Sequence, residues 1–232
     1  IQGTALAHLA KTLRKASSQN HPPRIVISEI EHPAVAQTAM SLEAFGFEIK
    51  RAPVNSEGKI EIDAFLKLIS PETLLVSIMR VNNIVGAIND VSQLAKEAKK
   101  KNPQLVFHTD AIQAFGKVEV PKLDSEVDLV SLSGHKIYGP KGVGCLILLN
   151  PDLAASGRIR PIVWGGGQEN GLRSGTENAG LISGFHLAAE SALTGATSFH
   201  QHLTHLRNHF AKKLGEKKLT PKPIHWNSPD SG

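Results

Sequence analysis

The sequence contains a single cysteine, Cys145, among its 232 residues. One cysteine excludes an intrachain disulfide and leaves the redox compartment open, with the cytoplasm slightly favoured. Because Cys145 lies in an apolar stretch, we interpret it as a buried small hydrophobic residue, which is how free cysteines usually behave. The sequence therefore predicts a cytoplasmic protein, although a segment ahead of Ile1 could carry an organelle signal.

Long apolar runs are also lacking. The longest, residues 145–149, has the length of a strand, whereas a membrane-spanning helix needs roughly 20 apolar residues. We therefore expect no membrane partner. No secretory or transit segment is visible, and the chain begins with isoleucine rather than methionine, so we expect that its true start is missing.

Aromatic residues are few, at 5% of the chain, and the net charge is +5. A positive charge indicates nucleic-acid binding more strongly when aromatic residues lie among the basic ones. The positive charge is concentrated in residues 96–101 and 212–218. Both blocks are short, fall near the ends of expected helices and lack interleaved aromatic residues. They are typical of solvated helix faces, and we expect no nucleic-acid partner.

Apolar runs typical of buried strands alternate with helical segments along the chain. Such alternation predicts an α/β fold with right-handed crossovers, in which a mainly parallel sheet carries helices on both faces. The expected strands cover residues 24–30, 47–53, 73–79, 104–110, 127–130 and 145–149. The expected helices cover residues 4–15, a segment ending near 45, 62–69, a segment capped by Asp90 and ending near 101, and 198–216.

Polar residues follow four of these expected strands directly. In parallel sheets, ligands gather at the carboxyl ends of the strands. This placement therefore predicts a binding site. The polar residues are His32, the pair Asn82 and Asn83, Asp110, and the group Ser133, His135 and Lys136.

Residues 131–144 form a loop with four glycines and one proline, more than a solvent turn needs. The loop offers the hydroxyl of Ser133, the imidazole of His135 and the amine of Lys136 to one small anionic ligand. The alternative is a surface hairpin with an exposed lysine. The spacing of a nucleotide-binding P-loop is absent.

The pattern Ser-x-Ser-Gly-His-Lys-x-x-Gly-Pro-Lys-Gly-x-Gly in this loop resembles the pyridoxal-phosphate (PLP) lysine motif of class V aminotransferase-like enzymes, in particular cysteine desulfurases and selenocysteine lyases. The resemblance implies a fold-type I PLP-dependent transferase large domain. It implies that Lys136 forms a Schiff base with PLP and moves the substrate's α-proton. Ser133 and His135 match the residues that hold the phosphate.

A second motif of this family is matched by His-Thr-Asp-Ala-Ile-Gln, which contains Asp110 and Gln113. The resemblance implies that Asp110 keeps the ring nitrogen protonated, so that the ring accepts the carbanion electrons. Gln113 would bond the phenolic oxygen of the ring. The local sequence also allows Asp110 to cap a following helix. We expect one helix and one strand between Asp110 and Lys136.

His32 and Asn83 match two further family segments. The resemblance implies that His32 stacks over the cofactor ring and assists proton transfer, for which an unperturbed pKa of about 6.5 is suited. The local alternative is a histidine at a helix start. Asn83, in Val-Asn-Asn-Ile-Val-Gly, is implied to lie beside the ring. Because Ile84 replaces the usual glutamate of the family, we expect the hydrogen bonding there to differ.

Residues 165–178 resemble the family's Gly-Gly-Gly-x-Glu-x-x-x-Arg-x-Gly-Thr segment. The threonine of that segment reaches the phosphate of the partner subunit, so Thr176 implies a homodimer with shared active sites. The alternative is a loop and helix cap near Thr176. Farther on, His205 and His209 share a helix face, but no carboxylate or cysteine completes a ligand set, and we expect a solvated helix and no metal.

The resemblance implies that the chain is the central, cofactor-binding part of a family member. We expect a PLP-binding large domain over residues 1–195, with its lead-in missing, and the start of a truncated small domain over residues 196–232. Family desulfurases accept sulfur on a cysteine well beyond the PLP lysine. We expect the sulfur-accepting cysteine to lie outside this chain, and we expect the chain alone to be inactive.

The implied reaction is removal of sulfur or selenium from L-cysteine or L-selenocysteine to give L-alanine, with an acceptor protein for the sulfur or selenium. The sequence does not separate the two substrates. Two alternatives stay open, namely another class V aminotransferase and a non-catalytic, truncated PLP-domain protein.

Overall fold

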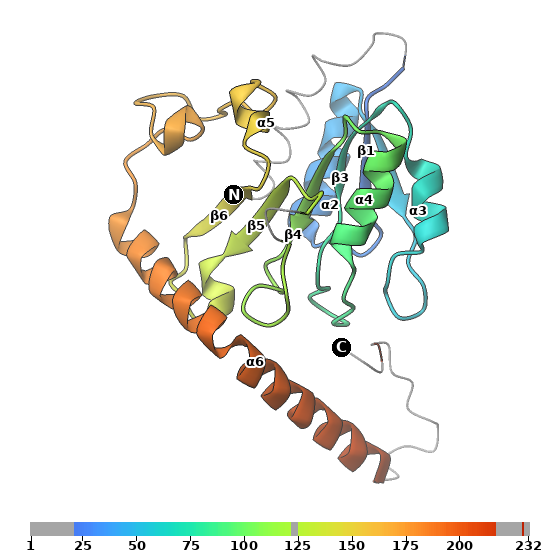
Figure 1. The fold of residues 1–232 in the computed structure, drawn as a ribbon, viewed down its shortest axis with the longest axis vertical. Helices are drawn as coiled ribbons and strands as arrows, with labels where there is room; N and C mark the ends of the chain where they lie inside the picture. The colour runs from blue at the N-terminus through green and yellow to red at the C-terminus, as the bar shows by residue number, and fades with distance from the viewer. Residues whose placement is uncertain (1–20, 122–124, 217–228, 230–232) are drawn as a thin grey trace.

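The computed structural model describes residues 21–121, 125–216 and 229 (Figure 1). Short extended runs, most of them containing valine, isoleucine or leucine, form a six-stranded sheet in the order β2-β1-β3-β4-β5-β6. The strands are β1 (Arg24–Ser28), β2 (Glu48–Ala52), β3 (Thr73–Ser77), β4 (Val106–Asp110), β5 (Leu129–Ser133) and β6 (Gly144–Leu148). The helix expected at residues 4–15 lies outside the described residues.

The first five strands are parallel, and β6 runs antiparallel to β5. The connection from β5 to β6 is a short loop, and a short loop permits only an antiparallel neighbour. Because five of the six strands are parallel, the predicted mainly parallel sheet is confirmed.

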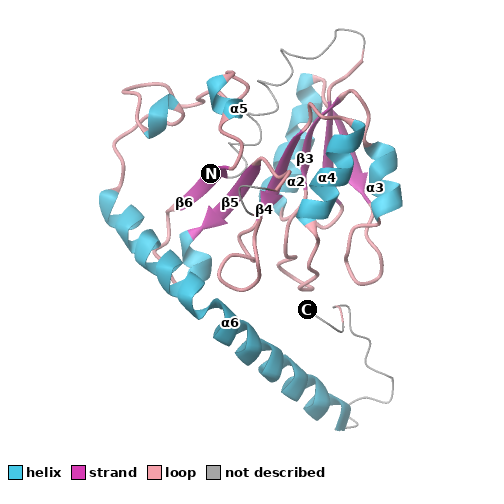
Figure 2. Cartoon of the chain, in the orientation of Figure 1, coloured by secondary structure: helices cyan, strands magenta, loops and turns pink. Residues whose placement is uncertain are grey.

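Helices cover both faces of this sheet (Figure 2). On one face, Val35 and Ala39 of α2 (Pro33–Ser41) pack with Ile25 and Ile27 of β1. The α5 helix (Asp152–Ala155) adds to the same core. On the other face, the core joins residues of α3 (Ile62–Leu68) and α4 (Val91–Lys101) to the alternate residues of the same strands. This arrangement confirms the predicted helices on both faces.

The α4 helix shows how local sequence sets its bounds. The side chain of Asp90 accepts a hydrogen bond from the backbone N–H of Gln93 at 3.1 Å and caps the helix, as predicted. Its lysine-rich end is not entirely solvated, because Lys99 forms an ion pair with the buried carboxylate of Asp128 at 2.9 Å. For Lys99, the prediction of a solvated charge is therefore wrong.

The expected helix between Asp110 and Lys136 is also wrong. The described residues 111–121 form turns. Backbone hydrogen bonds to Ala111 begin a helical turn, but Gly116 adopts a left-handed φ of 74° and ends it. A Cβ at Gly116 would lie 2.6 Å from the Cβ of Ala192. The close approach of another helix therefore also requires glycine at this position.

That neighbouring helix is α6 (Ala179–Glu216), which starts beside β6 and extends past the sheet (Figure 1). It begins well before residue 198, where the sequence predicted its start. The predicted domain boundary at residue 195 falls inside α6, and the division into two domains stays a prediction. None of the described helices combines the length and apolar character that crossing a bilayer requires.

The remaining described helices are 3-10 turns. They are η1 (Leu42–Phe45), η2 (Gly134–Ile137) and η3 (Glu169–Gly171). Of these, η2 follows β5 directly and carries the residues of the glycine-rich loop. It positions His135 and Lys136 at the end of β5.

Candidate active site

A cavity of about 570 Å³ lies at the carboxyl ends of β1, β3, β4 and β5. Residues from four separate loops meet there, as expected for a mainly parallel sheet. The predicted site residues that line the cavity are His32, Asn83, Asp110, Gln113, Ser133, His135 and Lys136. The eighth, Thr176, is exposed on the loop before α6 and is not among the lining residues.

Lys136 is presented by η2, which is a tight turn. The hydroxyl of Ser133 and Nδ1 of His135 lie 2.8 Å apart, so these two side chains hold each other beside the lysine. A Cβ on Gly139 would lie 2.9 Å from the carbonyl oxygen of Gly134, which only glycine avoids without a shift of the backbone. The exposed Lys136 therefore stands on a compact base.

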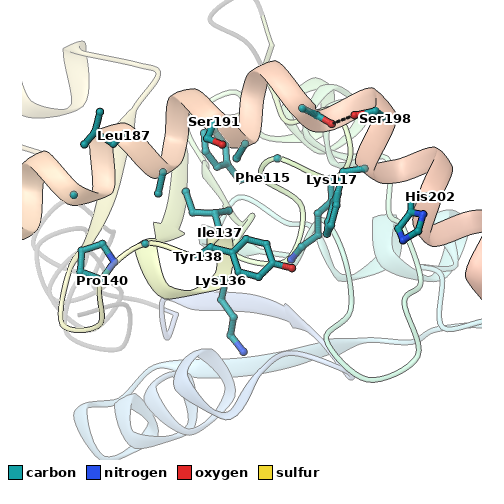
Figure 3. Close-up of a pocket in the computed structure, with 17 residues that line it drawn as sticks. Phe115, Lys117, Lys136, Ile137, Tyr138, Pro140, Leu187, Ser191, Ser198 and His202 are labelled. Atoms are coloured by element: carbon teal, nitrogen blue, oxygen red, sulfur yellow. Dashed lines mark hydrogen bonds between the residues drawn. The ribbon is translucent and has the colours of Figure 1, made fainter.

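Lys136 also borders a second cavity of about 700 Å³, between η2, α6 and the loop at Phe115 (Figure 3). The rings of Tyr138 and Phe199 meet edge to face there, with centroids 6.4 Å apart. Figure 3 shows the side chain of Lys136 pointing away from α6. The lysine amine is thus directed away from the helix that bounds this second cavity.

Asp110 is the last residue of β4 and is only 4% exposed. Its Oδ1 accepts a hydrogen bond from the backbone N–H of Ile112 at 2.9 Å, within a turn. Within the described residues 111–121 a single helical turn follows, and Asp110 caps that turn, so the alternative drawn from local sequence holds for one turn rather than for a full helix. It is the only acidic residue among the described residues that line the first cavity.

Gln113 is held by Lys117, whose Nζ donates to Oε1 of Gln113 at 3.1 Å. An ammonium group only donates hydrogen bonds, so the amide oxygen must face Lys117. Burial, together with the nearby charge of Lys136, lowers the pKa of Lys117. The amide nitrogen of Gln113 is left as its donor for other partners.

His32 lies at the start of α2. Its Nδ1 accepts a hydrogen bond from the backbone N–H of Ala34 at 3.1 Å, so the local alternative of a helix-start histidine is confirmed. The same residue lines the cavity. With Nδ1 accepting, a neutral His32 carries its proton on Nε2.

The turn that carries Asn83 is built by its neighbour Asn82, which is buried. The side-chain oxygen of Asn82 accepts from the backbone N–H groups of Ile84 and Val85 at 2.9 and 2.8 Å. Its amide nitrogen donates to the carbonyl oxygen of Ile30 at 3.0 Å. Ile84 itself is 85% exposed. The family's glutamate is therefore not needed to form this turn.

Sequence reasoning missed His108, a buried residue of β4 that lies two positions before Asp110 and contacts both neighbouring strands. Its ring nitrogens lie 2.8 Å from the hydroxyls of Ser77 on β3 and Ser131 on β5. Burial lowers the pKa of His108 to about 3, so the ring is neutral. The signal for this link was three polar residues inside otherwise apolar strands.

Glu31 was also missed as a site residue in its own right. It is 8% exposed and precedes His32 directly. Its Oε1 accepts hydrogen bonds from the hydroxyl of Ser28 at 2.6 Å and from the backbone N–H of Met79 at 2.7 Å. A carboxylate in the Glu-His motif was visible in the sequence, but its burial was not.

Two further sequence expectations concern cysteine and metal. Cys145 is half-buried on β6 rather than fully buried, and burial raises the pKa of its thiol. The rings of His205 and His209 stack with centroids 6.4 Å apart. Among the described residues, no group of three or more histidine, cysteine, aspartate or glutamate side chains is placed to hold a metal ion.

Comparison with known proteins places this geometry in a family. The aminotransferase class-V family model matches residues 2–221. Cysteine desulfurase IscS of Dictyoglomus turgidum is 39% identical over 207 residues, which cover 89% of this chain and 50% of that protein. The mitochondrial cysteine desulfurase of Candida albicans is 43% identical over 166 residues, covering 71% of this chain and 33% of that protein.

Solved structures agree with the sequence relatives. A NifS-like protein superposes with a TM-score of 0.84 and 36% identity, covering 93% of this chain and 57% of the other. SspA in complex with cysteine gives a TM-score of 0.72 and 35% identity, covering 82% and 52%. These neighbours confirm the fold-type I architecture, and this chain spans about half the length of the curated relatives it matches. The chain belongs to the aminotransferase class-V family.

Proposed function

We propose that this chain forms the cofactor half of a cysteine desulfurase, which uses PLP to remove sulfur from L-cysteine and leaves L-alanine. The observation that carries the proposal is the convergence of seven side chains from four loops on one cavity. Among them are the amine of Lys136 and the buried carboxyl of Asp110.

The residues present fit PLP. This cofactor needs an amine for its aldehyde, a carboxylate for its ring nitrogen and hydrogen-bond donors for its phosphate. Lys136 offers the amine, Asp110 the carboxylate, and Ser133 with His135 the donors. The amide nitrogen of Gln113, oriented by Lys117, suits the phenolic oxygen of the ring.

PLP, when bound, supplies an electron sink for the carbanion at the substrate's α-carbon. The chain's own residues do the rest. Asp110 would hold the proton on the ring nitrogen, because a buried carboxylate favours a nearby positive charge. Lys136 would move the α-proton, and His32, which lines the same cavity, would be able to pass a proton through Nε2.

The relatives support cysteine as the substrate, because they are named cysteine desulfurases and SspA was solved in complex with cysteine. Selenocysteine would require the same steps from the residues described here. The predicted cytoplasmic location stays a prediction, since a mitochondrial relative also matches.

Two further parts of the enzyme lie beyond this one site. Thr176 is exposed and does not line the cavity of its own chain, which supports a homodimer in which it serves the partner's cofactor. The raised pKa of Cys145 makes its thiol a poor nucleophile. We propose that the sulfur-accepting cysteine and the acceptor protein are separate from Cys145, so that this chain alone releases no sulfur.

Exchange of the α-proton of L-alanine tests the proposal without a sulfur acceptor. The chain is mixed with PLP and L-alanine in deuterated water, and the α-proton signal is followed by NMR. We expect the signal to decay with the unsubstituted chain and with Lys141→Ala, but not with Lys136→Ala. Exchange that survives Lys136→Ala contradicts the proposal, and transfer of the amino group to a 2-oxo acid indicates an aminotransferase instead.

A further inference from the structure

Glu31 joins two strands beneath the site. One of its carboxyl oxygens, Oε1, accepts from the hydroxyl of Ser28 at the end of β1 and from the backbone N–H of Met79 beyond β3. Met79 itself lines the cavity. A single carboxyl oxygen therefore ties the turn that carries His32 to the loop after β3.

The other oxygen of Glu31, Oε2, is buried and has no hydrogen-bond partner among the described residues. A buried carboxylate without a paired cation is strongly disfavoured, whereas a neutral carboxylic acid costs much less to bury. Burial raises the pKa of Glu31 to about 8, against the opposing effect of its two hydrogen bonds. The negative charge of Asp110 raises it as well.

We propose that Glu31 is a positioning residue that acts in its protonated form, holding the His32 turn against the loop after β3 and leaving Asp110 as the single carboxylate charge at the cavity. The inference rests on the proposed function, because it assigns Glu31 a part in arranging that same site. A protonated Glu31 keeps Oε1 as an acceptor for Ser28 and Met79, and its proton sits on the unpartnered oxygen.

The charges around Glu31 favour this arrangement. On the elements packed against it, Ser28 and Met79 contribute uncharged partners, His32 is its exposed neighbour, and Asp110 of β4 is the charged group whose field reaches it. Glu31 itself does not line the cavity, so its charge would act on Asp110 from behind the lining. If both carboxyls were ionised, two negative charges would repel each other, whereas with Glu31 neutral the charge of Asp110 alone would be available to a protonated ring nitrogen.

The pH dependence of unfolding tests the protonation state without any cofactor. The folded-state pKa of Glu31, about 8, lies above its ordinary value of 4.5, so its contribution to stability is complete below pH 4.5 and is lost as the pH rises to 8. Glu31→Gln keeps an acceptor oxygen and is neutral throughout. As the pH rises through this window, we expect the equilibrium constant for folding of the unsubstituted chain to fall relative to that of Glu31→Gln, by up to about tenfold for each pH unit.

Glu29→Gln is the matched control, because Glu29 lies in the same turn but is exposed. We expect its pH profile to follow that of the unsubstituted chain. If Glu31→Gln also follows the unsubstituted chain from pH 4.5 to 8, Glu31 is not protonated in the fold and the proposal is wrong.

The positioning role is tested by the NMR signals of the His32 ring and by PLP binding at pH 7. We expect Glu31→Ala to shift the His32 signals and to weaken PLP binding about tenfold or more, whereas Glu31→Gln stays within about twofold of the unsubstituted chain. Unmoved His32 signals in Glu31→Ala would overturn the proposal. If the unsubstituted chain binds no PLP, the proposed function fails, and the His32 signals and the pH profile still decide the role of Glu31.

Discussion

Lys117 fixes the direction in which the amide of Gln113 points. It lies one helical turn farther along the loop after β4, although that loop is not a helix, and its ammonium can meet only the amide oxygen. Gln113, which lines the cavity, is thus oriented by a residue that does not line the same cavity. Its contribution should appear in binding rather than in folding.

Replacement of Lys117 by methionine removes this donor and keeps most of the side-chain volume. We expect PLP to bind about threefold to tenfold more weakly, because a hydrogen bond of this kind contributes about 0.5–1.5 kcal/mol. A titration followed by absorbance measures the change. Lys96→Met, exposed on α4, should bind as the unsubstituted chain does, and an unchanged affinity in Lys117→Met would contradict the role.

Some site residues could be predicted from sequence and others could not, for a physical reason. Lys136 and Asp110 lie in motifs next to apolar runs, so their place at strand ends follows from local pattern. His108 and Glu31 act through partners distant in the sequence, such as Ser77 on β3 and Met79 in the loop after β3. Their burial and hydrogen bonds exist only once the sheet is assembled.

The hairpin formed by β5, η2 and β6 is the element on which the site depends most. Gly144 pairs with Ser133 at the end of the two strands that adjoins the connecting loop. A Cβ at Gly144 would lie 2.7 Å from the carbonyl oxygen of Leu132, a backbone atom that cannot move aside alone. The glycine therefore sets the distance between the two strands.

Gly144→Ala should destabilise the fold by about 1–3 kcal/mol, the usual cost of overpacking, and weaken PLP binding with it. Urea unfolding measures the first effect. Gly195→Ala is the matched control, since nothing lies within 4 Å of its Cβ position in α6, and it should stabilise the helix by up to about 1 kcal/mol. A Gly144→Ala chain as stable as the unsubstituted one would refute the packing argument.

At the level of elements, the sequence predicted strands better than helices. Most of the strands contain short apolar runs, and each expected strand is found with small shifts at its ends. The helix expected after Asp110 failed because a left-handed Gly116 ends the first turn. The early start of α6 was missed because residues 179–197 lack a strong apolar period on which to base a prediction.

The whole molecule depends on pH through His108, which links three neighbouring strands. In the folded chain the pKa of His108 is about 3, below its ordinary value of 6.5. Between these two pH values the imidazole is therefore protonated in the unfolded chain and neutral in the folded chain. Stability is therefore complete above pH 6.5 and lost as the pH falls towards 3. The direction and window differ from those of Glu31, whose contribution is lost as the pH rises from 4.5 to 8.

We expect His108 to lower the free energy of unfolding by about 1.4 kcal/mol for each pH unit below 6.5. Urea unfolding of the unsubstituted chain and of His108→Gln between pH 7.5 and 5 measures this slope as the difference between the two chains, because Glu31 contributes an opposite slope to both. His108→Gln should reduce the slope and lower stability at pH 7 by about 1–3 kcal/mol, because Ser77 and Ser131 lose a buried partner. His186→Gln, on the exposed side of α6, should change neither, and an unchanged slope in His108→Gln would contradict the assignment.

Borohydride trapping identifies the lysine that binds PLP. The chain is incubated with PLP, its absorption spectrum is recorded, the cofactor is fixed with borohydride, and the modified peptide is identified by mass spectrometry. We predict a band for the lysine-bound cofactor and a single modified residue, Lys136, with the band lost in Lys136→Ala and kept in Lys141→Ala. Modification spread over several lysines, or a band that survives Lys136→Ala, would contradict this prediction.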